Sequence, residues 1–171
     1  MNMLNSKELI NKVKSYNKFL NPETLSKAYD FALKAHEKQK RDEGSPYIIH
    51  PIAVANILTE LKLDSATIAT GLLHDTIEDT HATYQNIREQ FGKEVADLVE
   101  GVTKISEFEN QAMPNSKAEN FRKLILATSK DIRVLLVKIA DRLHNMRTIS
   151  SIDNLEKRER IAKETMEIYS P

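Results

Sequence analysis

The fold class is decided by VLLVKI at residues 134–139, the one run whose Val- and Leu-rich composition is typical of a buried strand. A strand needs a partner, and no segment of the sequence alternates apolar and polar residues so that it could pair with this run. We therefore interpret the run as part of a fully buried helix over residues 131–149. The sequence then predicts an all-α protein.

Helical periodicity and capping residues define the other predicted elements. Asn21 and Pro22 begin a helix, because Asn accepts from unpaired amides and Pro is suited to the first helical position. Ser65 is predicted to cap a later helix, and Ser116 with Glu119 forms a capping box before another. Further helices are expected over residues 52–61, 84–91, 93–104, 117–129 and 154–169, with a loop over residues 106–115.

The composition limits the classes of protein that the chain can belong to. It has 171 residues, 40% of them apolar, and 25 Lys and Arg balance 25 Asp and Glu. One domain of this length can bury a core, and the balanced charge argues against a protein that coats nucleic acid or an anionic membrane. The absence of Cys excludes disulfides, thiolate metal sites and cysteine nucleophiles. Without a signal-peptide pattern or a membrane-spanning apolar run, we expect a cytoplasmic protein.

The hexapeptide HDTIED at residues 74–79 places an imidazole and three carboxylates on one side of a helix end. At about 100° per residue, the side chains of His74, Asp75, Glu78 and Asp79 fall within an arc of about 140°. Like charges held this close repel one another and lose hydration, so a divalent cation is the usual partner for them. The alternative is that Glu78 and Asp79 only solvate the helix end.

Two further segments supply side chains of the same kind. Asp141 and Asn145 lie four residues apart at the end of an apolar helix, so they project from one face. His50 lies in the apolar neighbourhood YIIHPI at residues 47–52. Each residue alone is more often a satisfied polar group of a core. Together with His74 and Asp75, His50 and Asp141 make a ligand set that suits Mn²⁺, Fe²⁺ or Zn²⁺ better than Ca²⁺.

The order of these residues resembles a known family. His50, then His74 with Asp75, then Asp141 is similar to the pattern of the HD superfamily of metal-dependent phosphohydrolases, a family of helical bundles. The resemblance is closer to the hydrolase domain of the RelA/SpoT family of bacterial (p)ppGpp synthetase/hydrolases, and it covers residues 25–171. It rests on four phrases: GSPYIIHP at 44–51, LLHDTIEDT at 72–80, GVTKIS at 101–106 and DIRVLLVKIADRLHNMRTI at 131–149.

The resemblance implies an enzyme, a metal and a division of roles. It implies a Mn²⁺-dependent hydrolase that removes the 3′-diphosphate from (p)ppGpp in alarmone turnover, giving GDP or GTP and pyrophosphate. The implied metal ligands are His50, His74, Asp75 and Asp141. Glu78 and Asp79 occupy the positions that activate and relay the water, and the positions lining the nucleotide pocket are those of Arg41, Tyr47, Asn145 and Thr148.

The resemblance also bears on the extent of the chain and on the remaining histidines. Residues 1–20 are expected to be an N-terminal helical extension and residues 21–171 the hydrolase domain, truncated at its C-terminal end and without the synthetase domain. A synthetase partner or a homo-oligomer is compatible with this interpretation. We expect His36 to be structural and His81 to be exposed. His144 is expected to be either a hydrogen-bond partner beside the site or a packed core residue.

Two alternatives to this function stay open, and one departure from the family pattern supports the second. Where the family commonly has a basic pair followed by Ser, Arg41 is followed here by Asp42 and Glu43. These acids are expected to pair with Arg41 and weaken its attraction for phosphate; the alternative is that they point to solvent and pair with neighbouring Lys. The first alternative is an HD nucleotidase that acts on another nucleotide. The second is a non-catalytic fragment that binds alarmone or a synthetase partner without turnover. No ligand or acid position is lost, which argues against this second alternative.

Overall fold

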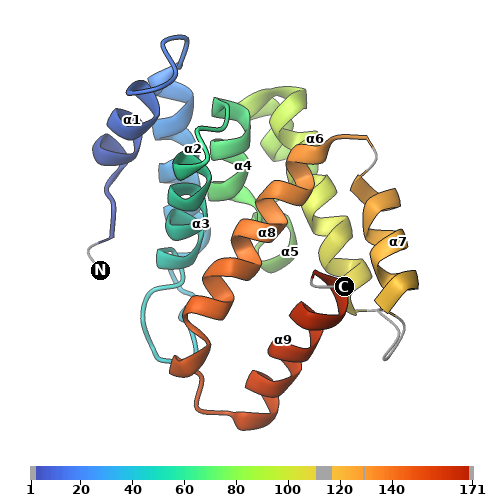
Figure 1. The fold of residues 1–171 in the computed structure, drawn as a ribbon. Helices are drawn as coiled ribbons and strands as arrows, with labels where there is room; N and C mark the ends of the chain where they lie inside the picture. Colours follow the sequence, from blue (N-terminus) through green and yellow to red (C-terminus); the bar gives the residue numbers. More distant parts are fainter. Residues whose placement is uncertain (1–2, 111–116, 129, 170–171) are drawn as a thin grey trace.

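The structure, a computed structural model, describes residues 3–110, 117–128 and 130–169 (Figure 1). Within these residues all regular structure is helical, apart from one isolated bridge between Lys40 and Pro46. The predicted all-α class is therefore confirmed. The helices are α1 (Ser6–Lys14), α2 (Pro22–Ala35), α3 (Ile49–Glu60), α4 (Ser65–Leu73), α5 (Thr76–Asp79), α6 (Tyr84–Asn110), α7 (Lys117–Thr128), α8 (Ile132–Arg147), the 3₁₀ turn η1 (Ile149–Ser151) and α9 (Leu155–Ile168).

Local capping chemistry sets several of the helix starts. Asn21 accepts a hydrogen bond from the backbone of Glu23, and Pro22 begins α2, as predicted. At α4 the N-cap position belongs to Asp64 and not to Ser65, which is the first helical residue. The predicted cap at Ser116 lies outside the described residues.

Helix α6 combines two predicted helices and continues beyond them. Gly92 separates the two parts with φ 87°, a left-handed conformation that glycine adopts without steric cost. The second part runs to Asn110, so the loop expected over residues 106–115 is wrong for its first five residues. The last turns are held from outside, because Ile105 packs in the core and Glu109 forms buried ion pairs with α8. Residues 111–115 lie outside the described part of the chain.

Helix α8 carries the run at residues 134–139, and only one of its faces is buried. Val134 and Val137 lie in the core, whereas Ile132 and Ile139 are 59% and 45% exposed. The expectation of a fully buried helix is therefore wrong. The reason is that α8 crosses the outside of α3 and α4 and packs on α6, so its opposite face has no neighbour among these helices (Figure 1).

The core sits between α2, α3, α4 and α6, and its tightest helix contact positions the site. A Cβ atom at Gly71 of α4 would lie 2.7 Å from Leu58 Cδ1 and 3.2 Å from the Cα of Ala55, both on α3. Glycine allows α4 to approach α3 this closely without a shift of Leu58 or Ala55. Helix α1 is attached to α2 and to this core through buried Leu9 and Val13. Among the described residues, no helix has the length and apolar character that a membrane span requires.

Candidate active site

Four side chains from three parts of the bundle meet where α3, α4 and α8 converge. His50 lies in the first turn of α3, His74 and Asp75 follow the last turn of α4, and Asp141 lies on α8. His50 Nε2 is 3.0 Å from Asp141 Oδ1, and His74 Nε2 is 3.0 Å from Asp75 Oδ2. The cross distances are 3.6 Å for His50 with Asp75 and 3.9 Å for His74 with Asp141. The structure thus brings together all four predicted metal ligands, and all four are buried.

The geometry of this cluster fits a divalent metal ion. His74 Nε2 is buried and has no hydrogen-bond partner, although Asp75 Oδ2 is only 3.0 Å away. The two atoms are therefore not aligned as donor and acceptor, and an unpaired buried nitrogen is costly. Two atoms that bind one ion at about 2.1 Å and at right angles lie about 3.0 Å apart. His50, His74 and Asp141 can each offer one atom to a common ion.

Three of the four ligands have a further contact that orients them. His74 Nδ1 donates to the carbonyl oxygen of Gly71 at 2.8 Å, which leaves Nε2 facing the cluster. His50 Nδ1 lies 2.7 Å from His144 Nδ1. Asn145 Nδ2 donates to Asp141 Oδ1 at 2.9 Å. Such outer contacts fix the tautomer and the orientation of metal ligands.

The charges in the cluster favour ionised carboxylates. Burial acts to raise the pKa of Asp75, but the positive charge on His74 outweighs it and lowers this pKa below its usual range. Burial opposes the protonated form of His74, yet the Asp75 carboxylate raises the pKa of His74 to about 9. For Asp141, burial is outweighed by Lys138, and its pKa is well below the ordinary value. A cluster that attracts a proton this strongly provides a site for a cation.

Two further acids lie beside the cluster on the short helix α5. Glu78 and Asp79 line the same cavity of about 180 Å³ as His50, Asp75 and Asp141, and both remain accessible to solvent. Burial, and then the charge of Asp75, raises the pKa of both carboxyls. A carboxyl group with a raised pKa is suited to exchange a proton with water.

The predicted substrate-binding residues lie in two separate places. Arg41, in the turn after α2, donates from Nη2 to Asn145 Oδ1 at 3.4 Å and to Thr148 Oγ1 at 3.3 Å. These three residues therefore form one polar group beside the ligands. Tyr47 instead donates its hydroxyl to Asp75 Oδ2 at 2.7 Å, and burial and the Asp75 charge raise its pKa. Tyr47 thus stays a donor to a predicted ligand.

The acids that follow Arg41 have different partners. Asp42 forms an ion pair with Lys157 of α9 at 2.8 Å, so the expectation that it pairs with Arg41 is wrong. Glu43 accepts from the hydroxyl of Ser45 at 2.6 Å and lies 3.8 Å from Arg41 Nε. Only Glu43 is thus placed to reduce the attraction of Arg41 for phosphate. Gly44, which follows these two acids, has a φ of 86°, a left-handed conformation that glycine adopts without steric cost.

Several residues of the cavity were not found from the sequence. Ser106, Glu109 and Asn110 of α6 line it, as does Lys138 of α8. Residues 106–110 belong to the segment interpreted as a loop, and Lys138 is the one charged residue in an apolar run. Of the remaining histidines, His36 is buried and its Nδ1 lies 2.6 Å from Gln39 Oε1, while His81 is exposed.

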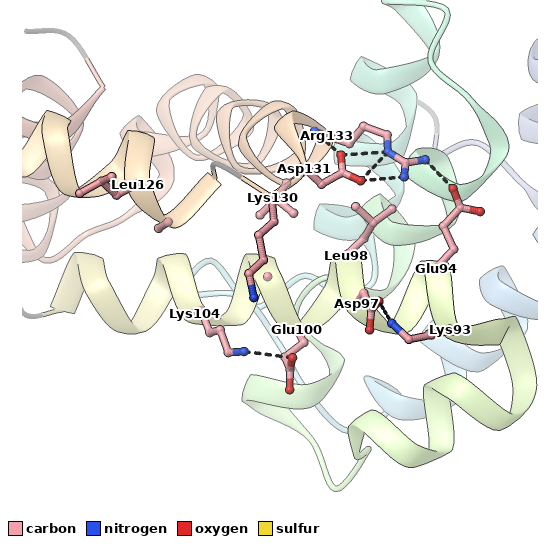
Figure 2. Close-up of a pocket in the computed structure, with 13 residues that line it drawn as sticks. Lys93, Glu94, Asp97, Leu98, Glu100, Lys104, Leu126, Lys130, Asp131 and Arg133 are labelled. Atoms are coloured by element: carbon pink, nitrogen blue, oxygen red, sulfur yellow. Dashed lines mark hydrogen bonds and ion pairs between the residues drawn. The ribbon is translucent and has the colours of Figure 1, made fainter.

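A larger cavity of about 970 Å³ lies away from these residues, between α6 and the facing ends of α7 and α8 (Figure 2). Its charged side chains are largely paired with one another: Lys104 with Glu100, Lys93 with Asp97, and Arg133 with Glu94 and Asp131. None of the predicted site residues lines it. The candidate active site is therefore the smaller, polar cavity.

The bundle and its His–Asp cluster define a class of protein. The family model described as HD domain matches residues 28–171, and the chain belongs to this family. The predicted resemblance to the RelA/SpoT family is also confirmed, by relatives and by a solved structure.

The relatives are much longer than this chain. GTP pyrophosphokinase rsh of Brucella melitensis is 53% identical over 99% of the chain, which covers 22% of that protein. The bifunctional (p)ppGpp synthase/hydrolase SpoT of Escherichia coli K12 is 56% identical over 86% of the chain, which covers 21% of that protein. The chain thus spans about a fifth of the length of these relatives. A solved structure, described as a metazoan ortholog of SpoT that hydrolyses ppGpp, superposes with a TM-score of 0.67 and 25% identity over 86% of both chains.

Proposed function

We propose that this chain is a Mn²⁺-dependent hydrolase that converts ppGpp or pppGpp to GDP or GTP and pyrophosphate. The observation that carries the proposal is the buried cluster of His50, His74, Asp75 and Asp141 with two acids of raised pKa beside it. The relatives described as SpoT-type hydrolases support the choice of substrate.

The proposed reaction breaks one phosphorus–oxygen bond. Water adds to the phosphorus attached to the 3′ oxygen, that oxygen leaves with a proton, and pyrophosphate is released. A divalent ion held by the four ligands would make a water molecule acidic near neutral pH and polarise a phosphoryl oxygen. The two nitrogens and two oxygens of the ligand set suit Mn²⁺.

The residues of the chain account for the other steps. Glu78 and Asp79 take the proton from water and return one to the 3′ oxygen, as carboxyls of raised pKa can do. Arg41, with Asn145 and Thr148, binds the anionic substrate beside the ligands. Tyr47 holds the Asp75 carboxylate through its hydroxyl.

The proposal also covers where the chain acts and what lies next to it. We expect a cytoplasmic nucleotide substrate and a synthetase region as neighbour, since a relative is described as a bifunctional synthase/hydrolase. The division into an extension over residues 1–20 and a hydrolase domain over residues 21–171 stays a prediction.

The test is a turnover assay on the purified chain. Incubation with ppGpp and Mn²⁺ should release pyrophosphate and GDP, and chelation of the metal should stop the release. Parallel reactions with GTP, GDP, ATP and dGTP test the nucleotidase alternative, which requires faster turnover of one of these. Tight binding of ppGpp without pyrophosphate release would identify a non-catalytic fragment and contradict the proposal.

A further inference from the structure

Lys138 lies beneath the candidate metal cluster with its ammonium group enclosed. The residue is 5% exposed, and its Nζ is 2.8 Å from Asp141 Oδ2, 3.0 Å from Glu109 Oε2 and 2.9 Å from Ser106 Oγ. A lysine ammonium has three donors, so these three acceptors use all of them. Although Lys138 lines the active-site cavity, it has no donor left for a substrate phosphate.

Glu109, one of the two acidic partners of Lys138, is itself held in place. Arg142 donates to both oxygens of Glu109, at 3.0 and 2.9 Å, and Tyr169 also donates its hydroxyl to Glu109. The buried charges therefore alternate in the order Asp141, Lys138, Glu109 and Arg142. Buried lysines are rare unless paired, and a buried ion pair needs well-placed hydrogen bonds to offset desolvation. This network meets that condition and fixes the position of the ammonium group.

The two oxygens of Asp141 consequently have different surroundings. Oδ1 lies 3.0 Å from His50 Nε2 and accepts from Asn145, whereas Oδ2 is bound by Lys138. The carboxylate cannot rotate without breaking a buried charged contact. It presents one oxygen to the histidines and keeps the other oriented into the bundle.

We propose that Lys138, held by Glu109, is a positioning residue that keeps Oδ1 of Asp141 directed at the metal position. The inference rests on the proposed function in one respect, that the cluster binds a divalent ion. Four ligands that each give one atom leave two positions of a six-coordinate ion for water and substrate.

The experiment removes the positioning contact without changing net charge. Lys138→Met with Glu109→Gln loses one positive and one negative charge, so a change in Coulomb attraction for the ion is largely cancelled. The dissociation constant for Mn²⁺ is measured by electron paramagnetic resonance of free Mn²⁺. We expect it to rise about 10- to 100-fold, the usual effect of losing a contact that orients a ligand. A constant within threefold of the wild type would overturn the positioning role.

Two further variants keep the result interpretable. Lys104→Met with Glu100→Gln removes an exposed pair of the same kind on α6 and should leave the Mn²⁺ constant unchanged. Lys138→Gln with Glu109→Gln leaves two amides that can hydrogen-bond to each other. It replaces the first double variant if that one does not fold, and the same 10- to 100-fold rise in the Mn²⁺ dissociation constant is expected. Circular dichroism establishes folding in each case. A folded wild-type chain that binds no divalent metal contradicts the proposed function, whereas equal binding by wild type and double variant contradicts only the role of Lys138.

Discussion

His144 Nδ1 lies 2.7 Å from His50 Nδ1, while the other nitrogen of His50 faces Asp141 at 3.0 Å. Burial lowers the pKa of His144 to about 4, so His144 is neutral and can accept the Nδ1 proton of His50. We assign this tautomer from the geometry. His144 thereby holds the ring of His50 with Nε2 directed at the metal position.

His144→Phe should therefore weaken metal binding while keeping a ring of similar size. We expect the Mn²⁺ dissociation constant to rise about 10- to 100-fold, because His50 loses the acceptor that fixes its tautomer. Calorimetric titration with Mn²⁺ measures the change. His81→Phe, at an exposed position, is the matched control and should bind as wild type. Equal constants for the two variants would show that His144 only fills space.

Asp141→Asn tests whether the four ligands form a single site that contributes to stability. Mn²⁺ that binds only the folded chain must stabilise it, by about 2.7 kcal/mol at 100 times the dissociation constant. The wild-type melting temperature should therefore rise with Mn²⁺, whereas that of Asp141→Asn should not. Metal content after gel filtration should fall in parallel. An unchanged content and an unchanged response to Mn²⁺ would contradict the single-site arrangement.

Glu78→Gln separates chemistry from metal binding. Glu78 lines the cavity but is neither in the group of His50, His74 and Asp141 that can share an ion nor paired with it as Asp75 is, so the variant should keep Mn²⁺ and substrate affinity. Its turnover of ppGpp should fall by about two to four orders of magnitude if the carboxyl exchanges a proton in the rate-limiting step. Steady-state kinetics with Mn²⁺ analysis gives both quantities. Loss of Mn²⁺ would make Glu78 a ligand, and full activity would exclude it from the mechanism.

The turn at residues 41–43 should affect substrate capture through Arg41 and Glu43. Arg41→Ala should raise KM for ppGpp, because its guanidinium beside Asn145 and Thr148 is lost. Glu43→Gln should lower KM and leave kcat unchanged, and the effect should shrink with added salt, as for charges screened over about 10 Å near 0.1 M salt. Asp42→Asn is the control, since Asp42 pairs with Lys157 instead. If Glu43→Gln and Asp42→Asn have equal KM values, Glu43 does not modulate Arg41.

Gly71→Ala should disturb the candidate metal cluster through the contact between α4 and α3. The added Cβ would meet Leu58 and the backbone of Ala55, which pushes α4 away from α3 and so separates His74 from His50. We expect a loss of about 1–3 kcal/mol in unfolding free energy, as overpacked cores show, together with weaker Mn²⁺ binding. Denaturant unfolding and Mn²⁺ titration measure the two effects.

Gly101→Ala is the matched control for this crowding. Its Cβ would lie 2.8 Å from Val134 Cγ2, in a contact between α6 and α8 at the larger cavity. It should lower stability without changing Mn²⁺ affinity. If Gly71→Ala binds Mn²⁺ as tightly as Gly101→Ala does, the close approach of α3 and α4 does not set the metal geometry.

Much of the local structure could be predicted because its causes are local. Asn21 and Pro22 begin α2 by contacts within three residues, and Gly92 interrupts α6 through its own backbone angle. The spacing of His74, Asp75, Glu78 and Asp79 follows from one helix end. The identities of His50 and Asp141 as further members of the cluster came from their chemistry and from the family pattern, and not from any contact visible in the sequence.

The tertiary structure decided the contacts between residues that lie far apart in the chain. The end of α6 is helical because Glu109 meets Lys138 and Arg142, 29 and 33 residues later, and Asp42 faces Lys157 because α9 folds back on the turn. Helix α8 is buried on one side only because of where it lies on the bundle. By itself, then, the sequence determined most of the helices, the cap of α2 and the set of chemical groups. The partners of these groups depended on packing, since burial and charge pairing act through space and have no local pattern.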